Sequence, residues 1–319
     1  MKKRVFVYEY LSGGGPVDED PQVADALMPH GLAMRDALVT DLLRAADCAV
    51  TAATCPSAST LPVGAAGVQA AAGESALDFV ARQSTRHDLV WLVAPESGGL
   101  LAQFAHLVDP SRWLGCTPEA IALTTGKRAT LLLLAASGIA TPLGFEPDAR
   151  RWVTKPDDGA GGIATHLHDD LSAARDEAAQ RTRAGEAVTL EPWVDGDALS
   201  LSLACSARGV ELLSVNRQQI VIDAAGQLSF EGVVIDVMPT SDPRRGALAR
   251  LASQVGDAIP GLRGFVGIDL VWHAQHGPVV IEVNPRVTCA YVGLSEALGR
   301  NLATELLARH AEEHADAGR

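Results

Sequence analysis

Two carboxylates and one amide near the end of the chain have the types and spacing of a metal site. Asp269 lies in one apolar segment, and Glu282 and Asn284 lie in the next. Side chains two positions apart on a strand share a face, so Glu282 and Asn284 are predicted to point the same way. If the two segments pair as a hairpin, Asp269 joins them, and the three oxygen donors suit Mg²⁺ when phosphates complete its coordination. The alternative is a polar strand face with Glu282 exposed, which the apolar surroundings disfavour.

A lysine and a glycine-rich loop supply groups that bind phosphates. Lys155 precedes residues 157–162, Asp-Asp-Gly-Ala-Gly-Gly. The backbone N–H groups of small residues can close over phosphate oxygens, and the lysine adds a point charge. The loop is not a Walker A motif, which requires Gly-Lys-Ser/Thr at a helix start, and we expect a flexible flap between two strands. Lys127 is a second candidate cation, although taken singly it is typical of a solvated helix lysine.

A short segment and two arginines complete the set of candidates. Residues 191–197 (EPWVDGD) lie between predicted strands. An extended backbone there can pair with adenine, and a nearby acid can accept ribose hydroxyls; an ordinary turn is the alternative. The planar guanidinium of Arg286 suits a phosphoryl group or a carboxylate. Arg217 is a second candidate on a neighbouring strand, and a surface arginine on an alternating strand is its alternative.

The hydrophobic pattern predicts the elements that position these residues. Residues 4–10, 22–46, 48–54, 74–83 and 87–93 alternate as strand, helix, strand, helix and strand, which is typical of a parallel sheet flanked by helices. The elements expected next are a helix over 117–138, two short strands within 151–166, a helix at 170–183, strands through 187–237, a helix near 244–258, two further strands, and a closing helix at 295–313. The predicted domains are 1–115, 116–188 and 189–319.

Composition excludes several functional classes. The chain has 319 residues, 47% of them hydrophobic, and a net charge of −13. An acidic protein repels nucleic acid and anionic membrane surfaces, so we expect neither as a partner. No apolar run reaches the length of a membrane span, and the basic start runs into Glu9, which favours a first strand over a signal peptide. Five scattered cysteines without a CxxC motif favour reduced thiols and a cytoplasmic location.

Taken together, and in this order along the chain, the candidate residues resemble the ATP-grasp family. The resemblance covers roughly residues 115–300. The D-alanine–D-alanine ligases and biotin carboxylases of this family share an N-terminal α/β domain and two lobes that clamp ATP. The resemblance therefore implies an α/β and α+β protein with the ATP-grasp fold, preceded by a doubly wound pre-ATP-grasp domain. Members are often dimers, so a homodimer is the assembly that the family suggests.

The resemblance also implies a role for each candidate residue. Lys127 and Lys155 would bind the phosphates, covered by Gly159, Gly161 and Gly162 of the flap. Adenine would be bound by Glu191, Trp193 and Val194, and ribose by Asp197. Two Mg²⁺ ions, or Mn²⁺, would be bound by Asp269, Glu282 and Asn284. The hinge is one residue shorter than in the D-alanine ligases, which leaves Asp195 as the alternative for ribose. Arg286 and Arg217 are the candidates that steady the transferred group.

The implied chemistry is amide formation. A substrate carboxylate attacks the γ-phosphate of ATP while lysines and Mg²⁺ neutralise charge. An amine then captures the acyl phosphate, with the flap excluding water. The partners are thus small-molecule carboxylates and amines, and no protein nucleophile is required.

Two further motifs look like the tyramine–glutamate ligases of methanofuran-type cofactor synthesis. They are residues 8–15 (YEYLSGGG) and 284–294 (NPRVTCAYVGL). Members of that family carry two threonines after Asn-Pro-Arg, whereas the second position here is Cys289. The resemblance implies joining the γ-carboxylate of L-glutamate to tyramine, or to tyrosine. Ser12 to Gly15 can equally be a tight first turn of the sheet and not a ligand loop.

Three other functions remain open at this stage. A different ATP-grasp amino-acid or dipeptide ligase would have the same ATP site. A small-molecule kinase would share the first half-reaction. A non-catalytic nucleotide-binding protein is disfavoured, because such proteins lose a metal ligand or a phosphate lysine, and this chain retains all of them.

Overall fold

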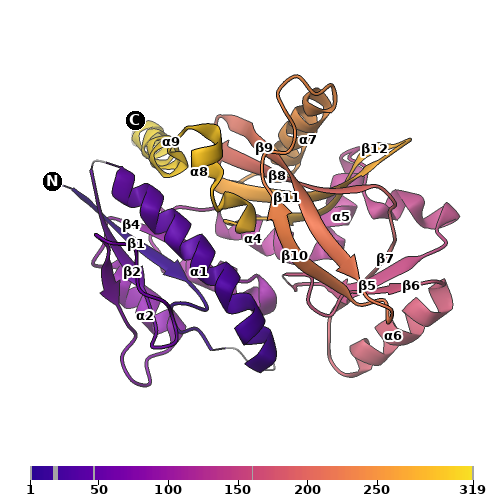
Figure 1. The fold of residues 1–319 in the computed structure, drawn as a ribbon, viewed down its shortest axis with the longest axis horizontal. Coiled ribbons are helices and arrows are strands. Elements are labelled where there is room, and N and C mark those ends of the chain that lie inside the picture. The colour runs from indigo at the N-terminus through magenta and orange to yellow at the C-terminus, as the bar shows by residue number, and fades with distance from the viewer. Residues whose placement is uncertain (1, 17–20, 46, 160, 318–319) are drawn as a thin grey trace.

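The computed structural model describes residues 2–16, 21–45, 47–159 and 161–317, with side chains omitted at 21–25 and 316–317. Ala160 of the predicted flap and residue 46 of the predicted first helix lie outside the described residues. The chain forms an N-terminal α/β domain and two lobes that face each other across the linking segments (Figure 1). This arrangement confirms the predicted fold class.

The N-terminal domain contains a four-stranded parallel sheet in the order β3-β2-β1-β4. Side chains of β1 alternate between two faces: Phe6 and Tyr8 pack toward α2 and α3, while Val5 and Val7 pack toward α1 and α9. Helices therefore cover both faces, as predicted, although α3 and β3 were not predicted from the sequence. The elements are β1 (Lys3–Glu9), α1 (Pro21–Arg44), β2 (Cys48–Ala53), β3 (Ala66–Val68), α2 (Ala76–Ser84), β4 (Leu89–Val93), η1 (Ser97–Gly99) and α3 (Leu100–Leu107).

The linker predicted as one helix over 117–138 is two helices, α4 (Pro118–Thr125) and α5 (Lys127–Ala136). Thr117 caps α4 by accepting a hydrogen bond from the N–H of Ala120. The break falls at Gly126, a weak helix former, and the flap contacts the first turn of α5 there: Lys127 donates its backbone N–H to the carbonyl of Asp157 at 3.0 Å. A weak helix former and a tertiary contact thus coincide where the sequence is helical on both sides.

The smaller lobe is a three-stranded antiparallel sheet in the order β6-β5-β7 with one helix against it. The glycine flap connects its first two strands, as predicted. The elements are η2 (Pro142–Asp148), β5 (Trp152–Pro156), β6 (His166–His168), α6 (Leu171–Arg183) and β7 (Val188–Pro192).

The larger lobe is a five-stranded antiparallel sheet in the order β10-β9-β8-β11-β12. One face packs its aliphatic side chains against α7. The other face is apolar at one end, where Phe265 packs in the second cluster, and carries polar side chains beyond it. The predicted closing helix is interrupted at Gly299, whose φ of 63° is left-handed and ends α8. The elements are β8 (Asp197–Ser206), β9 (Gly209–Ile222), β10 (Leu228–Val234), α7 (Arg244–Ala258), β11 (Gly264–His273), β12 (Gly277–Asn284), η3 (Cys289–Tyr291), α8 (Leu294–Leu298) and α9 (Leu302–Ala317).

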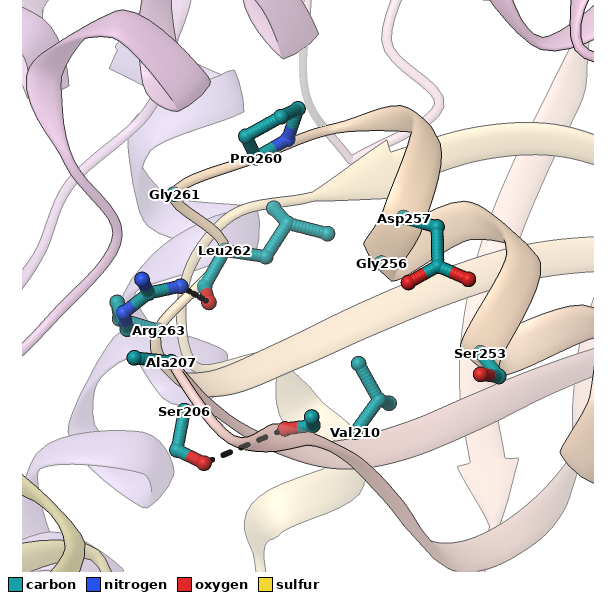
Figure 2. Close-up of a pocket in the computed structure, with 11 residues that line it drawn as sticks. Ser206, Ala207, Val210, Ser253, Gly256, Asp257, Pro260, Gly261, Leu262 and Arg263 are labelled. Carbon is teal, nitrogen blue, oxygen red and sulfur yellow. Dashed lines mark hydrogen bonds between the residues drawn. The ribbon is translucent and has the colours of Figure 1, made fainter.

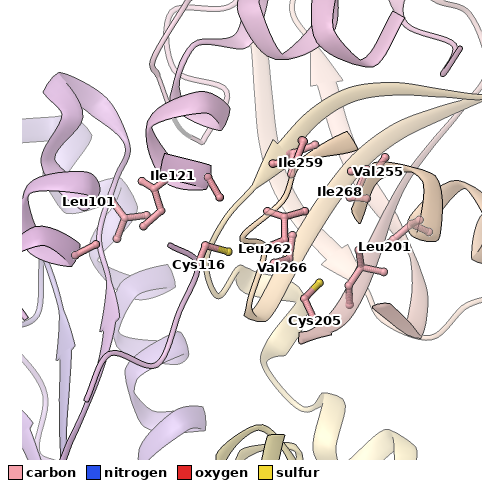
Figure 3. Packing of buried hydrophobic residues seen from close by; sticks show 14 of the residues in the cluster. Leu101, Cys116, Ile121, Leu201, Cys205, Val255, Ile259, Leu262, Val266 and Ile268 are labelled. Carbon is pink, nitrogen blue, oxygen red and sulfur yellow. The ribbon is translucent and has the colours of Figure 1, made fainter. Parts of the chain in front are cut away.

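A continuous apolar core joins the N-terminal domain to the larger lobe (Figure 3). Cys116 and Ile121 of the linker lie in one cluster with Leu262 and Val266 of the larger lobe. The helix α9 returns to the N-terminal sheet and contributes Leu302 to its second cluster. Because buried apolar contacts cross the boundary, the two parts hold a defined relative orientation. None of the described helices is long and apolar enough to cross a membrane.

Candidate active site

The predicted metal ligands meet on one sheet face. The strands β11 and β12 pair antiparallel and place Asp269 opposite Glu282, which confirms the predicted hairpin. Asn284 donates a hydrogen bond from Nδ2 to Oδ2 of Asp269 at 3.3 Å. Burial, with the nearby Glu282 carboxylate as the second cause, raises the pKa of Asp269 to about 7. Two carboxylates held this close indicate a site that a cation would stabilise.

The register of β8 and β9 decides which other residues share that face. Ser200 pairs with Asp269 on one side and with Asn216 on the other. Paired residues point to the same face, so Asn216 belongs to the polar face, where it is fully buried and donates to Ser202 Oγ at 3.0 Å. Asn216 was not predicted as a residue of this face, although it is adjacent in sequence to the candidate Arg217.

Arg217 lies on the other face of the sheet. Its partner on β8 is Leu199, whose side chain belongs to the apolar cluster against α7. Arg217 is exposed, and within the described part of the chain its guanidinium makes no hydrogen bond or ion pair. The structure therefore does not bring Arg217 to the acidic pair.

Lys127 joins three elements at the site. Its side chain is buried, with Nζ at 3.1 Å from Oε1 of Glu282, and Nζ also donates to the carbonyl of Gly159 in the flap. The alternative of a solvated helix lysine is therefore wrong. One cation lies between the predicted metal hairpin and the predicted phosphate flap, as a phosphate ligand should.

Lys155 is buried beside Glu191, with 2.7 Å between Nζ and Oε1. Burial raises the pKa of Glu191, Lys155 opposes that rise, and the nearby Glu282 adds to it. The electrostatic influence of Glu282 and Lys127 on Glu191 places both ion pairs in one network. The sequence analysis placed all four residues in the site but did not predict these two ion pairs.

The flap is fixed at its base by two aspartates. Asp157 accepts the N–H of Arg128 at 3.0 Å, and Asp158 accepts the N–H of Gly98 at 2.8 Å. Gly161 and Gly162 both have φ of 72°, which disfavours other residues. A side chain at Gly159 would collide with Pro156. The glycines thus adopt backbone conformations that other residues disfavour, in a flap that is held at its start.

The predicted adenine segment follows β7 directly. Val194 is buried, while Trp193 donates from Nε1 to Asp195 Oδ1 at 2.9 Å. Arg151 lies over the Trp193 ring at 5.4 Å from its centroid and pairs with Asp195 at 2.5 Å. Asp197 is mostly exposed at the start of β8. Both ribose candidates are exposed and both have a cationic neighbour, Arg151 for Asp195 and Arg244 at 3.6 Å for Asp197.

Arg286 forms a two-point ion pair with Glu96. The distances are 2.9 Å from Nε to Oε1 and 3.0 Å from Nη2 to Oε2, and both side chains are largely buried. Glu96 was not predicted as a site residue from the sequence. The available signal was a carboxylate directly after the apolar strand 89–93, where ligand groups gather at the carboxyl ends of parallel strands.

The two motifs of the suggested subfamily meet where the N-terminal domain contacts the larger lobe. Tyr291 is buried against Trp91 and Phe265, and its hydroxyl donates to Asp41 of α1 at 2.8 Å. Its observed contacts therefore stabilise the domain junction. The glycines after Ser12 form tight turns, with N–H to carbonyl bonds from Gly13 to Glu9 and from Gly15 to Tyr10.

Glu9 ends β1 as a buried carboxylate at the same junction. It accepts the N–H groups of Leu11 and Ser12 at 3.2 and 2.8 Å. Burial, the largest cause, raises the pKa of Cys289, and the Glu9 carboxylate contributes to that rise. The Glu9 carboxylate of the first motif and Arg286 therefore both lie within electrostatic range of Cys289 in the second motif.

Two cavities lie away from these residues. One of about 280 Å³ is formed by the β8–β9 turn, the end of α7 and residues 260–263 (Figure 2). The other, about 220 Å³, lies beneath α9 and is lined partly by Trp91 and Trp113. No predicted site residue lines either one. The candidate site is therefore identified by its charges and not by an open cavity.

Comparison with known protein families finds matches over the segments that carry the candidate site residues. The profile of the ATP-grasp domain matches residues 124–290, and that of the pre ATP-grasp 3 domain matches residues 36–121. A search of curated proteins finds no significant match. The chain is similar to a solved protein assigned to the ATP-grasp superfamily from Archaeoglobus fulgidus, with a TM-score of 0.68, 23% identity and coverage of 96% of this chain and 88% of the other.

Two enzymes of known activity have a similar fold. One is an L-amino acid ligase from Bacillus licheniformis, with a TM-score of 0.67, 17% identity and coverage of 96% and 73%. The other is a D-alanine–D-alanine ligase from Bacillus anthracis, with a TM-score of 0.67, 13% identity and coverage of 99% of each chain. At such identities the similarity concerns the fold.

Proposed function

This chain belongs to the ATP-grasp family, and we propose that it is an ATP-dependent ligase that joins a carboxylate to an amine through an acyl phosphate. One observation carries the proposal: Lys127 and Lys155 lie in one charge network with Glu191, Glu282 and, next to it, Asp269. Phosphoryl transfer depends mainly on positioning and charge neutralisation, and this network offers cations for phosphates beside carboxylates for a divalent ion.

The residues present fit Mg-ATP. Asp269 and Glu282 face each other, and their proximity disfavours ionisation of Asp269 without a cation. We propose that these two carboxylates and Asn284 hold Mg²⁺ or Mn²⁺, which supplies neutralisation of phosphate charge. Lys127 stands beside Glu282 and brings a cation to the same carboxylate.

The chain's own residues then have distinct tasks. Lys127 and Lys155 exchange contacts with carboxylates for contacts with phosphate oxygens, and the segment around Val194 receives adenine. The flap excludes water from the acyl phosphate. Arg286, already oriented by Glu96, steadies the transferred group or the substrate carboxylate.

For the substrates, we propose the γ-carboxylate of L-glutamate and the amine of tyramine or tyrosine. The support is the pair of motifs at residues 8–15 and 284–294 and the closeness of Glu9 and Cys289 at the junction near Arg286. A second candidate is an amino-acid or dipeptide ligase, favoured by the similarity to the L-amino acid ligase over 96% of the chain.

The test is ADP release from Mg-ATP with L-glutamate and either tyramine, tyrosine, other amines or no amine, with mass analysis of the products. We expect ADP release that requires both substrates, and a γ-glutamyl amide. Turnover with a different acid–amine pair would support the proposed ligase activity and contradict the proposed substrates. Release of ADP without an amine would indicate a kinase, and absence of both turnover and ATP binding would contradict the proposal.

A further inference from the structure

A turn of the N-terminal domain reaches into the site of the two ATP-clamping lobes. It follows β4 and contains Glu96, Ser97 and Gly98. Gly98 and Gly99 have φ of 61° and 69°, left-handed values that make the turn tight. Glu96 is 5% exposed, and it lies in the turn after β4, outside the strands and helices of its own domain. A buried carboxylate in such a place needs a partner.

That partner is the cation next to the predicted metal ligands. Glu96 contacts Arg286 at two points, and the Arg286 side chain is 12% exposed. One contact is a hydrogen bond, from Nη2 to Oε2, and the other is the close approach of Nε to Oε1, so the guanidinium is held against the Glu96 carboxylate. Nη1 donates to the carbonyl of Val287 at 3.3 Å, so one face of the arginine is held from the N-terminal domain and from its own backbone.

The other side of the same turn holds the flap. Gly98 donates its N–H to Asp158 Oδ2 at 2.8 Å, and Ser97 donates its hydroxyl to the Asp158 carbonyl at 3.2 Å. Three adjacent residues thus connect the flap to Arg286. The turn that carries Glu96 is therefore also a contact between the flap and the N-terminal domain.

Arg286 has competing partners close by. Its charge acts on Asp269, and the charge of Glu282 acts on Arg286. Without Glu96, the guanidinium would be a buried unpaired cation, and the predicted metal ligands Asp269 and Glu282 lie within electrostatic range of it. Glu96 therefore keeps Arg286 away from the carboxylates that a metal ion must reach.

We propose that Glu96 is a positioning residue that holds Arg286 in place for phosphoryl transfer and prevents it from competing with the metal ion. This inference rests on the proposed function. It differs from a purely structural role, in which the ion pair would contribute to stability alone.

The variants are E96Q, which keeps the size and removes the charge, and E74Q as the matched control. Glu74 forms a two-point pair with Arg82 at 2.6 and 2.7 Å in the same domain and is not one of the proposed site residues. We expect E96Q to lower the rate of ADP release about tenfold or more and to raise the Mg²⁺ concentration for half-maximal rate about threefold or more, equivalent to weakened metal binding. E74Q should change neither quantity. A Mg²⁺ dependence and rate in E96Q equal to those of E74Q would overturn the proposal.

A second measurement does not need the acid or the amine. MgADP with aluminium fluoride mimics the transferred phosphoryl group, and its affinity can be compared with that of MgADP alone. E96Q should weaken the fluoride complex more than MgADP, and adding E96Q to R286Q should cost nothing further. Additive losses would mean that Glu96 does not act through Arg286. If the wild type binds the complex but turns over no acid–amine pair, the proposed substrates fail while this comparison still decides the role of Glu96.

Discussion

Substitutions in the buried ion pair of Lys155 and Glu191 can distinguish an effect on stability from an effect on nucleotide binding. The two side chains are 7% and 4% exposed, and 2.7 Å separates their charged atoms. Removing one member of such a pair leaves an uncompensated buried charge, which costs about 3–5 kcal/mol. We therefore expect K155M and E191M each to lower the free energy of unfolding by that amount. For a urea slope of about 3 kcal/mol/M, the unfolding midpoint falls by about 1 M or more.

The double variant K155M/E191M tests the cause. It removes both charges and fills the space with apolar side chains, so most of the lost stability should return. ATP binding should not return, because the proposed phosphate cation is still missing. Urea unfolding followed by tryptophan fluorescence, with Trp152 and Trp193 close to the pair in sequence, gives the stability, and nucleotide titration gives the binding. A double variant as unstable as the single variants would refute the argument from buried charge, and nucleotide affinity near that of the wild type would refute the role of Lys155.

Three other changes test the remaining assignments. E282A should lower turnover at least about 10²-fold with an intact fold, because it removes a proposed metal ligand; unchanged turnover would contradict the metal site. R217A should retain turnover within about threefold, because its register partner Leu199 places it on the face opposite the acidic pair, and a large loss would restore its catalytic role. The hydrogen bond from Arg82 lowers the pKa of Glu74 to about 2, so the stability from this pair is present above about pH 4.5 and lost as the pH falls toward 2. The difference in melting temperature between wild type and E74Q should shrink over that range, and a constant difference would exclude this linkage.

Local patterns in the sequence predicted most of the elements correctly. The alternation at the start of the chain predicted the parallel sheet, and the apolar segments around Asp269 and Glu282 predicted the hairpin. The predicted helix boundaries were wrong where residues distant in sequence contact the helix. The helix over 117–138 breaks at Gly126, where the weak helix propensity of glycine and the contact of Asp157 with the start of α5 coincide.

Residue types and short-range spacing determined the chemistry that this chain can offer: oxygen donors on a hairpin, lysines beside a glycine loop, and an arginine after the metal strand. Such features depend on neighbours within a few positions, so one sequence is enough to see them. The tertiary structure alone decided the partners. It paired Lys127 with Glu282, Lys155 with Glu191 and Arg286 with Glu96. The register of β8 and β9 also directed Arg217 away from the acidic pair. These outcomes depend on contacts between residues up to 190 positions apart, which no local periodicity encodes.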